Sequence, residues 1–195
     1  FVDLGTGRTA RSVSAAGSYS CAVLDNSKVK CWGRSNSGQL GQGNTNTVGA
    51  AANEMGDSLP YVDLGTGRTA TMLNAGWEHV CAVLDNYSVK CWGRNTYGQL
   101  GQGAKTNRGY ANGQMGDNLP AVSLGTGRTA SYVYASSYYF TCAVLDNGGV
   151  KCWGRNDKGQ LGIGSTTDMG AGSNEMGDNL PVVDLGTGRT ATMVA

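Results

Sequence analysis

The stretch CWGRNTYGQLG, which runs from Cys91 to Gly101, decides the fold because near copies of it occur elsewhere in the chain. They read CWGRSNSGQLG from Cys31 and CWGRNDKGQLG from Cys152. A second string, LGTGRTA, recurs at intervals of 60, 60 and 61 residues, beginning at Leu4, Leu64, Leu124 and Leu185. A fixed period of this length is typical of tandem modules that stack on their neighbours. The phase divides the chain into repeats at residues 1–60, 61–120 and 121–181, with the start of a fourth at 182–195.

Each repeat is expected to form four short strands. In the second repeat these are residues 61–64, 69–75, 81–84 and 89–93, separated by a Gly-Thr-Gly turn and an Asp-Asn reversal. The 32 glycines, against 3 prolines, and a charged fraction of 15% describe a turn-rich β protein rather than a helical or disordered one. Four short strands at regular spacing are typical of a propeller blade. The predicted fold class is therefore all-β, with three tandem β-propeller-type blades and a partial fourth.

The six cysteines fall in pairs that are ten residues apart: Cys21 with Cys31, Cys81 with Cys91, and Cys142 with Cys152. If the hairpin reverses at Asn86, the two cysteines of the second repeat lie opposite each other on one face, within reach of a disulfide. Persistent disulfides indicate an oxidising compartment, so the predicted location is extracellular or at the cell surface. A zinc site and buried reduced cysteines remain as alternatives, although the C-x9-C spacing is unusual for zinc.

The overall charge excludes several classes of partner. A net charge of +1 provides no field that would hold nucleic acid or an anionic membrane. No apolar run approaches the length that a membrane span requires. We therefore expect neither nucleic acid nor membrane as a partner.

The string from Trp92 to Gly101 resembles the repeat of the regulator of chromosome condensation family, whose hallmark is W-G-x-N-x-x-G-Q-L-G once per blade. The resemblance implies a propeller blade, a scaffold used by a nucleotide-exchange factor, a plant UV-B photoreceptor and β-lactamase inhibitor proteins. The paired cysteines make the chain similar to secreted members of the family. Familiar members close a ring of about seven blades. Three repeats and a fragment therefore predict an open array rather than a closed ring.

Residues that recur in every repeat are interpreted as architecture. They include the arginines of the Gly-Thr-Gly-Arg turn and those after Trp-Gly, namely Arg8, Arg68, Arg128, Arg189, Arg34, Arg94 and Arg155. The alternative is an anion-binding stripe, which the recurring Asp57, Asp117 and Asp178 would neutralise. A calcium role for Glu54, Asp57, Glu175 and Asp178 is a further alternative, but Gln114 interrupts it in the second repeat.

No catalytic, cofactor-binding or metal-binding residue is predicted. His79 is the single histidine, and no serine or cysteine nucleophile is placed beside it in the sequence, so we expect a half-buried strand residue. The Gly-Thr-Gly string is not a phosphate-binding loop, because a second strand rather than a helix is expected to follow it.

Two sets of residues remain as candidate surface sites. The position just before the first cysteine of each repeat varies and is aromatic, which favours recognition by Tyr19, Trp77, Tyr138, Tyr139 and Phe140. Asn86 heads the triplet Asn86-Tyr87-Ser88 at a hairpin tip and is a candidate for glycosylation.

The leading functional hypothesis is a non-enzymatic extracellular structural array, either a segment of a longer secreted protein or part of a head-to-tail fibre. Its partners would be further copies of the same repeat. The alternative is a partial propeller that binds a protein or glycan through its variable loops. Near-identity of the repeats favours the structural hypothesis, because a specific binding site requires one rim to diverge.

Overall fold

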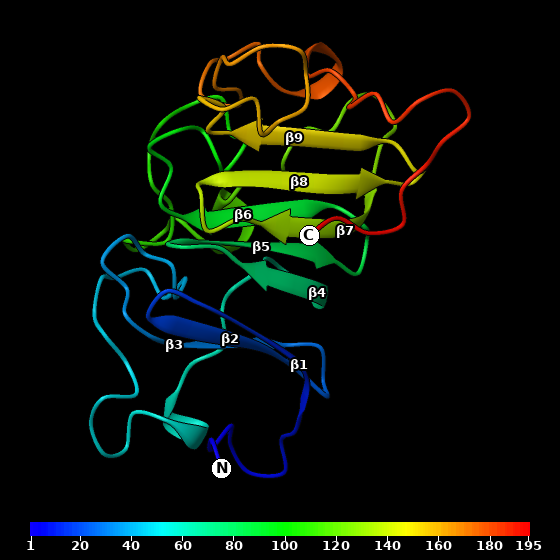
Figure 1. The fold of residues 1–195 in the computed structure, drawn as a ribbon. Helices are drawn as coiled ribbons and strands as arrows, with labels where there is room; N and C mark the ends of the chain where they lie inside the picture. The colour runs from blue at the N-terminus through cyan, green and yellow to red at the C-terminus, as the bar shows by residue number, and fades with distance from the viewer.

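A computed structural model describes residues 1–195 as three antiparallel sheets that follow one another along the chain (Figure 1). Each sheet has three strands in sequential order. Blade 1 contains β1 (Ala10–Ala16), β2 (Tyr19–Leu24) and β3 (Val29–Gly33). Blade 2 contains β4 (Ala70–Ala75), β5 (His79–Leu84) and β6 (Val89–Gly93). Blade 3 contains β7 (Ala130–Ala135), β8 (Phe140–Leu145) and β9 (Val150–Gly154). One-turn 3-10 helices occur at Gly56–Ser58, Gly116–Asn118 and Gly177–Asn179.

The cysteine hairpin has the predicted register. Cys81 lies opposite Cys91, and Val83 lies opposite Val89. The structure contains the three disulfides Cys21–Cys31, Cys81–Cys91 and Cys142–Cys152, and no cysteine is free. Neither the zinc alternative nor the reduced-cysteine alternative is compatible with this pairing.

The prediction of a fourth strand in each blade is wrong. Residues 61–64 form no strand and share a single backbone hydrogen bond with the preceding blade, from Val62 N to the Val29 carbonyl at 2.8 Å. The same bond recurs from Val122 to Val89 and from Val183 to Val150. A single backbone hydrogen bond does not make a β-ladder, which needs a series of them. The Gly-Thr-Gly turn that follows is held by side chains instead.

A buried lysine holds this turn against the long loop of its own blade. Lys90 Nζ donates to the carbonyls of Leu64 at 2.9 Å and Gly116 at 2.8 Å. Thr66 donates its N–H and its hydroxyl to the two carboxylate oxygens of Asp117, at 2.9 and 2.6 Å. Gly65 has a φ of +111°, and a Cβ there would come within 2.7 Å of Asp117. We call this arrangement the lysine clasp; it explains why LGTG, the lysine and MGD recur together.

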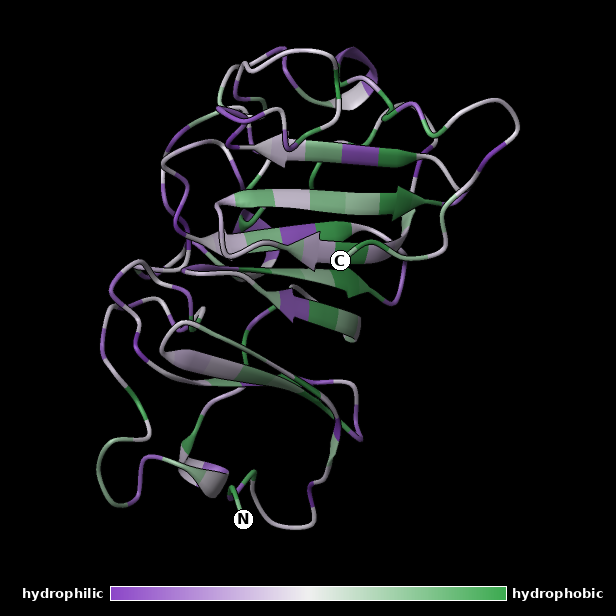
Figure 2. Ribbon diagram, in the orientation of Figure 1, coloured by the Kyte–Doolittle hydropathy of each residue, from purple (hydrophilic) through white to green (hydrophobic).

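The blades pack face to face, and the tryptophan of the repeat is buried between them. Trp92 and Trp153 are fully buried, and their indole N–H groups donate to the carbonyls of Gln39 and Gln99 in the preceding blade, at 3.1 and 2.9 Å. One apolar core combines residues of blades 1 and 2, and a second combines blades 2 and 3. Figure 2 shows hydrophobic residues concentrated in the stacked strands, whereas the loops are more polar. Burial between neighbours therefore stabilises the stack.

The stack is open, and its two ends are far from closing a ring (Figure 1). Residues 182–195 contain no strand. They run beside blade 3, where Val183 N donates to Val150 O and Ala191 N to Gly148 O, both at 2.8 Å. The structure contains no helix with the length and apolarity needed to cross a bilayer.

Candidate functional site

One rim of blades 2 and 3 carries arginines interleaved with tyrosines. Arg94 follows β6 and lies over the ring of Tyr139, which precedes β8, with its guanidinium carbon 5.1 Å from the ring centre. Arg155 follows β9 and lies over Tyr97 at 5.3 Å. The two tyrosine rings are 5.6 Å apart. These contacts order the four side chains before any partner arrives. We call this group the Arg–Tyr rim.

The charges of the Arg–Tyr rim are already paired. Arg94 Nη1 lies 2.7 Å from Glu78, and this hydrogen bond raises the pKa of the guanidinium. Arg155 Nη2 lies 2.8 Å from Asp157, whose pKa is lowered chiefly by that hydrogen bond. The turn arginines are paired as well, since Arg8, Arg68 and Arg128 contact the hairpin-tip aspartates Asp25, Asp85 and Asp146 at 3.1 to 3.2 Å. The rim is thus electrically balanced, which disfavours an anion-binding stripe.

The predicted recognition aromatics differ in exposure. Trp77 is 47% exposed and Tyr138 is 71% exposed, whereas Tyr139 and Phe140 are partly exposed. Tyr19 must be removed from this set, because it is 4% exposed and its hydroxyl donates to the carbonyls of Gly76 and His79 at 2.8 and 2.7 Å. Tyr19 is therefore covered by blade 2 and links blades 1 and 2, so it is not available to contact a partner.

Hollows at the two ends of the stack contrast with the filled joint between blades 1 and 2. The end face of blade 3 has a hollow of about 310 Å³ lined by Tyr138, Phe140, Arg155, Asp157, Lys158 and Gln160. At the same place on blade 1, Trp77 and Glu78 of blade 2 fill the hollow and leave only about 20 Å³. The free face of blade 1 has a hollow of about 470 Å³ that includes Trp32. The two large hollows therefore lie where a neighbouring blade would pack.

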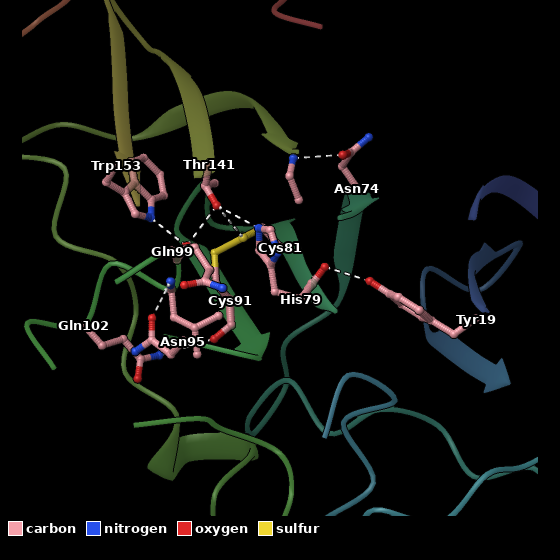
Figure 3. Close-up of a disulfide and its surroundings, with 12 residues drawn as sticks. Tyr19, Asn74, His79, Cys81, Cys91, Asn95, Gln99, Gln102, Thr141 and Trp153 are labelled. Atoms are coloured by element: carbon pink, nitrogen blue, oxygen red, sulfur yellow. Dashed lines mark hydrogen bonds between the residues drawn. A yellow bond between two sulfur atoms is a disulfide. The ribbon is translucent and has the colours of Figure 1, made fainter. Parts of the chain in front are cut away.

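His79 is fully buried between blades 2 and 3 rather than half-buried as expected (Figure 3). Its Nε2 is 3.1 Å from the hydroxyl of Thr141, which itself donates to the Gln99 carbonyl at 2.9 Å. Because the hydroxyl proton is used there, Nε2 must be the protonated nitrogen, and Nδ1 is left without a partner. Burial lowers the pKa of His79 to about 3. A neutral histidine closed off from solvent cannot serve as a general acid or base.

The loop acids are occupied by backbone donors. Glu54 accepts the N–H groups of Gly49, Ala50 and Ala51 at 2.8 to 2.9 Å, and these bonds lower its pKa. In blade 2 the amide oxygen of Gln114 takes the same place and accepts two corresponding N–H groups, both at 3.2 Å. Asp57 and Asp178 belong to lysine clasps. This explains the Glu-to-Gln change between repeats and leaves the calcium alternative without ligands.

Asn86 lies exposed at the tip of the β5–β6 hairpin. Its Oδ1 accepts from the N–H and the hydroxyl of Ser88, at 3.2 and 2.7 Å. Sequence reasoning missed Tyr97, which belongs to the Arg–Tyr rim. A tyrosine at that position occurs only in the second repeat, so the divergence from Ser37 and Lys158 was the available signal.

Stacked three-stranded blades whose tryptophans bond across each joint define a β-propeller-type repeat protein. A family model, the regulator of chromosome condensation (RCC1) repeat, matches residues 10–39, 73–99 and 135–160. The ultraviolet-B receptor UVR8 of Arabidopsis thaliana is 29% identical over 160 residues, covering 81% of this chain and 32% of that protein. Protein RCC2 homolog of Xenopus laevis is 28% identical over 162 residues, covering 82% and 28%. By these matches the chain is similar to proteins built from RCC1 repeats.

Solved structures show the same fold. Human WBSCR16 superposes with a TM-score of 0.66 at 19% identity, covering 86% of this chain and 41% of that one. Yeast RCC1 (Prp20), solved with Kap60 bound, gives a TM-score of 0.61 at 16% identity and coverages of 83% and 33%. The chain spans about a third of the ultraviolet-B receptor and of the RCC2 homolog.

Proposed function

We propose that this chain is a segment of a non-enzymatic, extracellular structural array of RCC1-like blades. In the native material every blade face is covered by a further blade, either in a longer secreted chain or in a head-to-tail fibre. The observation that carries the proposal is the exposed face of blade 1. Trp32 is partly exposed there, whereas its equivalents Trp92 and Trp153 are fully buried.

The first strand of blade 1, β1, is also more exposed than the first strands of blades 2 and 3. Val13 is 59% exposed, whereas Leu73 and Val133 at the same position are 6% and 0% exposed. Only the presence of a preceding blade distinguishes the buried positions from the exposed one. Exposed apolar side chains on one face of a blade are candidates for contact with a partner.

The opposite end of the stack lacks a neighbour in the same way. A Cβ on Gly38 or Gly98 would meet the backbone of the next blade's loop at 2.4 Å, whereas nothing lies within 4 Å of that position at Gly159. The Gln160 carbonyl has no indole donor, although Gln39 and Gln99 each have one. A following blade would supply both contacts.

The oxidising location rests on the three hairpin disulfides, because such bonds persist in secreted proteins and are rare in the cytosol. The exposed Asn86 fits glycosylation in a eukaryotic secretory pathway. Its hairpin tip lies away from the large hollows, so a glycan there is compatible with stacking.

Electron microscopy of native material tests the array. We expect continuous fibres, or chains with many more blades than three. Closed rings of about seven blades would contradict the open array and favour the ordinary propeller of the family. Discrete three-blade particles would contradict both.

The Arg–Tyr rim favours a second candidate, a module that recognises a protein. Trp, Tyr and Arg are the residues enriched in binding hot spots, and Trp77 and Tyr138 lie exposed beside the rim. Yeast RCC1 (Prp20), which has the same fold, has been solved with the protein Kap60 bound. A screen against extracellular proteins tests the candidate. Binding should be lost in Trp77→Ala and Tyr138→Ala but kept in Tyr87→Ala, an equally exposed control at the opposite end of the hairpin; equal binding by all three refutes it.

A further inference from the structure

The joint between blades 1 and 2 contains a hollow of about 200 Å³ that is separate from the Arg–Tyr rim. Residues 41–43 and 60–63 line it from blade 1, and residues 111–115 line it from the long loop of blade 2. Contacts across the joint hold these two sides together. Gly43 N donates to the Gly109 carbonyl at 3.1 Å, and a Cβ on Gly41 would come within 3.1 Å of the Met115 side chain. We call this feature the joint hollow; it lies within one chain and is complete without a further blade.

One aromatic ring lines the joint hollow. Tyr61 is 38% exposed, and the ammonium groups of Lys28 and Lys30 each lie 4.8 Å from the centre of its ring. These cation–π contacts order the ring before any ligand arrives. An ordered ring gives the hollow an apolar surface against which the C–H groups of a ligand pack.

Two polar side chains beside this ring have hydrogen-bonding groups that the chain does not use. Asn112 is exposed, and its side chain makes no hydrogen bond within the chain, so its amide offers two donor hydrogens and one acceptor oxygen. Asp63 Oδ1 accepts from the N–H of Gly65 at 2.9 Å, which leaves its Oδ2 as a free acceptor. Donors and acceptors are therefore both available in the joint hollow.

Gln42 adds a third free group, because its neighbour differs from that of its counterpart. In blade 2 the Nε of Arg108 donates to Gln102 Oε1 at 3.0 Å. In blade 1 the residue at the position of Arg108 is Val48, which has no donor in its side chain. The Oε1 of Gln42 is thus an unused acceptor in the lining of the hollow.

These residues are not required to build a joint. The joint between blades 2 and 3 is closed in the same way, by a bond from Gly103 N to the Gly170 carbonyl at 3.1 Å. At that joint Tyr61, Asp63 and Asn112 correspond to Ala121, Ser123 and Ser173. The aromatic ring, the carboxylate and the amide therefore belong to one joint alone, and the packing of blades does not explain them.

We propose that the joint hollow binds a neutral sugar through a single pyranose ring. Such a ring combines an apolar face of C–H groups with hydroxyls that each donate and accept a hydrogen bond. The charge of Asp63 disfavours an anion, and the adjacent ammonium group of Lys28 disfavours a cation. The hollow is smaller than the roughly 300–1,000 Å³ of sites for drug-sized ligands, which suits one ring rather than a peptide.

The bound ring packs against Tyr61, and its hydroxyls donate to Asp63 Oδ2 and Gln42 Oε1. Asn112 donates to a ring hydroxyl from the side of blade 2. Because the partners come from both blades, the sugar bridges the joint and stabilises the folded chain. With one ring in contact we expect a dissociation constant of about 1–10 mM, and a longer glycan gains affinity only where further rings touch the surface.

Titration of the full chain with glucose, galactose and mannose, followed by nuclear magnetic resonance, tests the site. We expect at least one of these hexoses to shift the side-chain amide signals of Gln42 and Asn112 and the backbone amide of Gly113, at concentrations up to about ten times that dissociation constant. Inorganic phosphate serves as the charged comparison. The proposal is overturned if none of the three hexoses moves these signals, or if phosphate alone moves them.

A variant that copies the other joint provides the control for folding. Tyr61→Ala, Asp63→Ser and Asn112→Ser together give the first joint the residues that the chain already has at the second. We expect the combined variant to weaken hexose binding by about tenfold or more, and Tyr87→Ala at the distant hairpin tip to leave it unchanged. Asn112→Ser alone, at an exposed position, keeps the test decisive if the combined variant folds poorly. Hexose shifts of unchanged size in both the combined and the single variant would refute a site in the joint hollow.

Discussion

The same residue in the same motif is covered by a neighbouring blade at Trp92 and uncovered at Trp32, which makes the two a matched pair. Trp92 is fully buried and donates to Gln39 across the joint. An aromatic residue of this size buries roughly 150–250 Å², which at about 25 cal/mol per Å² amounts to roughly 4–6 kcal/mol. Measured costs of Trp→Ala in cores, about 3–5 kcal/mol, agree with this range. We expect Trp92→Ala to lower the free energy of unfolding by about 3–5 kcal/mol.

Trp32→Ala should cost about 1–2 kcal/mol less, because the indole already meets water on one side and bonds to no preceding carbonyl. The assay is urea unfolding under non-reducing conditions, followed by circular dichroism, with hydrogen exchange to locate the weakened blade. Equal losses for the two variants would show that the neighbouring blade contributes nothing to burial. A Trp92→Ala loss below about 1 kcal/mol would refute the stacked joint itself.

Three further predictions concern separate features. Folded His79 stays neutral down to about pH 3, whereas an unfolded histidine gains its proton near pH 6.5, so unfolding takes up a proton between these pH values. The free energy of unfolding should therefore be about 2 kcal/mol lower at pH 5 than at pH 7. The variant His79→Phe should lose this part of the pH dependence. Peptide mapping without reduction should find Cys81 linked to Cys91, a bond expected to stabilise by about 2–3 kcal/mol, and a link between blades would contradict the hairpin register. Expression in a eukaryotic secretory system should give a glycan mass that Asn86→Gln removes, whereas an unchanged mass would show the triplet to be unused.

The sequence predicted the blade hairpins well because their signals are local. Cys81 and Cys91 stand five residues on either side of the turn, and strand periodicity alone then fixes which side chains face each other. The period likewise placed the cysteine hairpins of all three blades, since the same sequence in the same surroundings adopts one conformation.

The parts that were mispredicted depend on contacts across joints. Residues 61–64 have the composition of a strand, but side-chain bonds from Lys90 and Asp117 hold the turn beside them, and no pattern within the segment reports that. Tyr19 and Phe140 occupy the same position in their blades, yet Tyr19 is buried under the next blade and Phe140 is partly exposed. Burial at a joint depends on which blade comes next and on the size of its residues, so it became visible only in the stacked structure.

The central claim, that these blade faces are built to be covered by further blades, is tested most directly by adding one. A second copy of residues 121–181 placed ahead of Phe1 supplies the missing neighbour to blade 1. The account predicts that quenching of Trp32 fluorescence and exchange of its indole N–H fall to the level of Trp92, while Trp77 stays accessible as the internal control. If Trp32 remains as accessible as before in the folded four-blade chain, blade 1 is a finished end and the array account is contradicted.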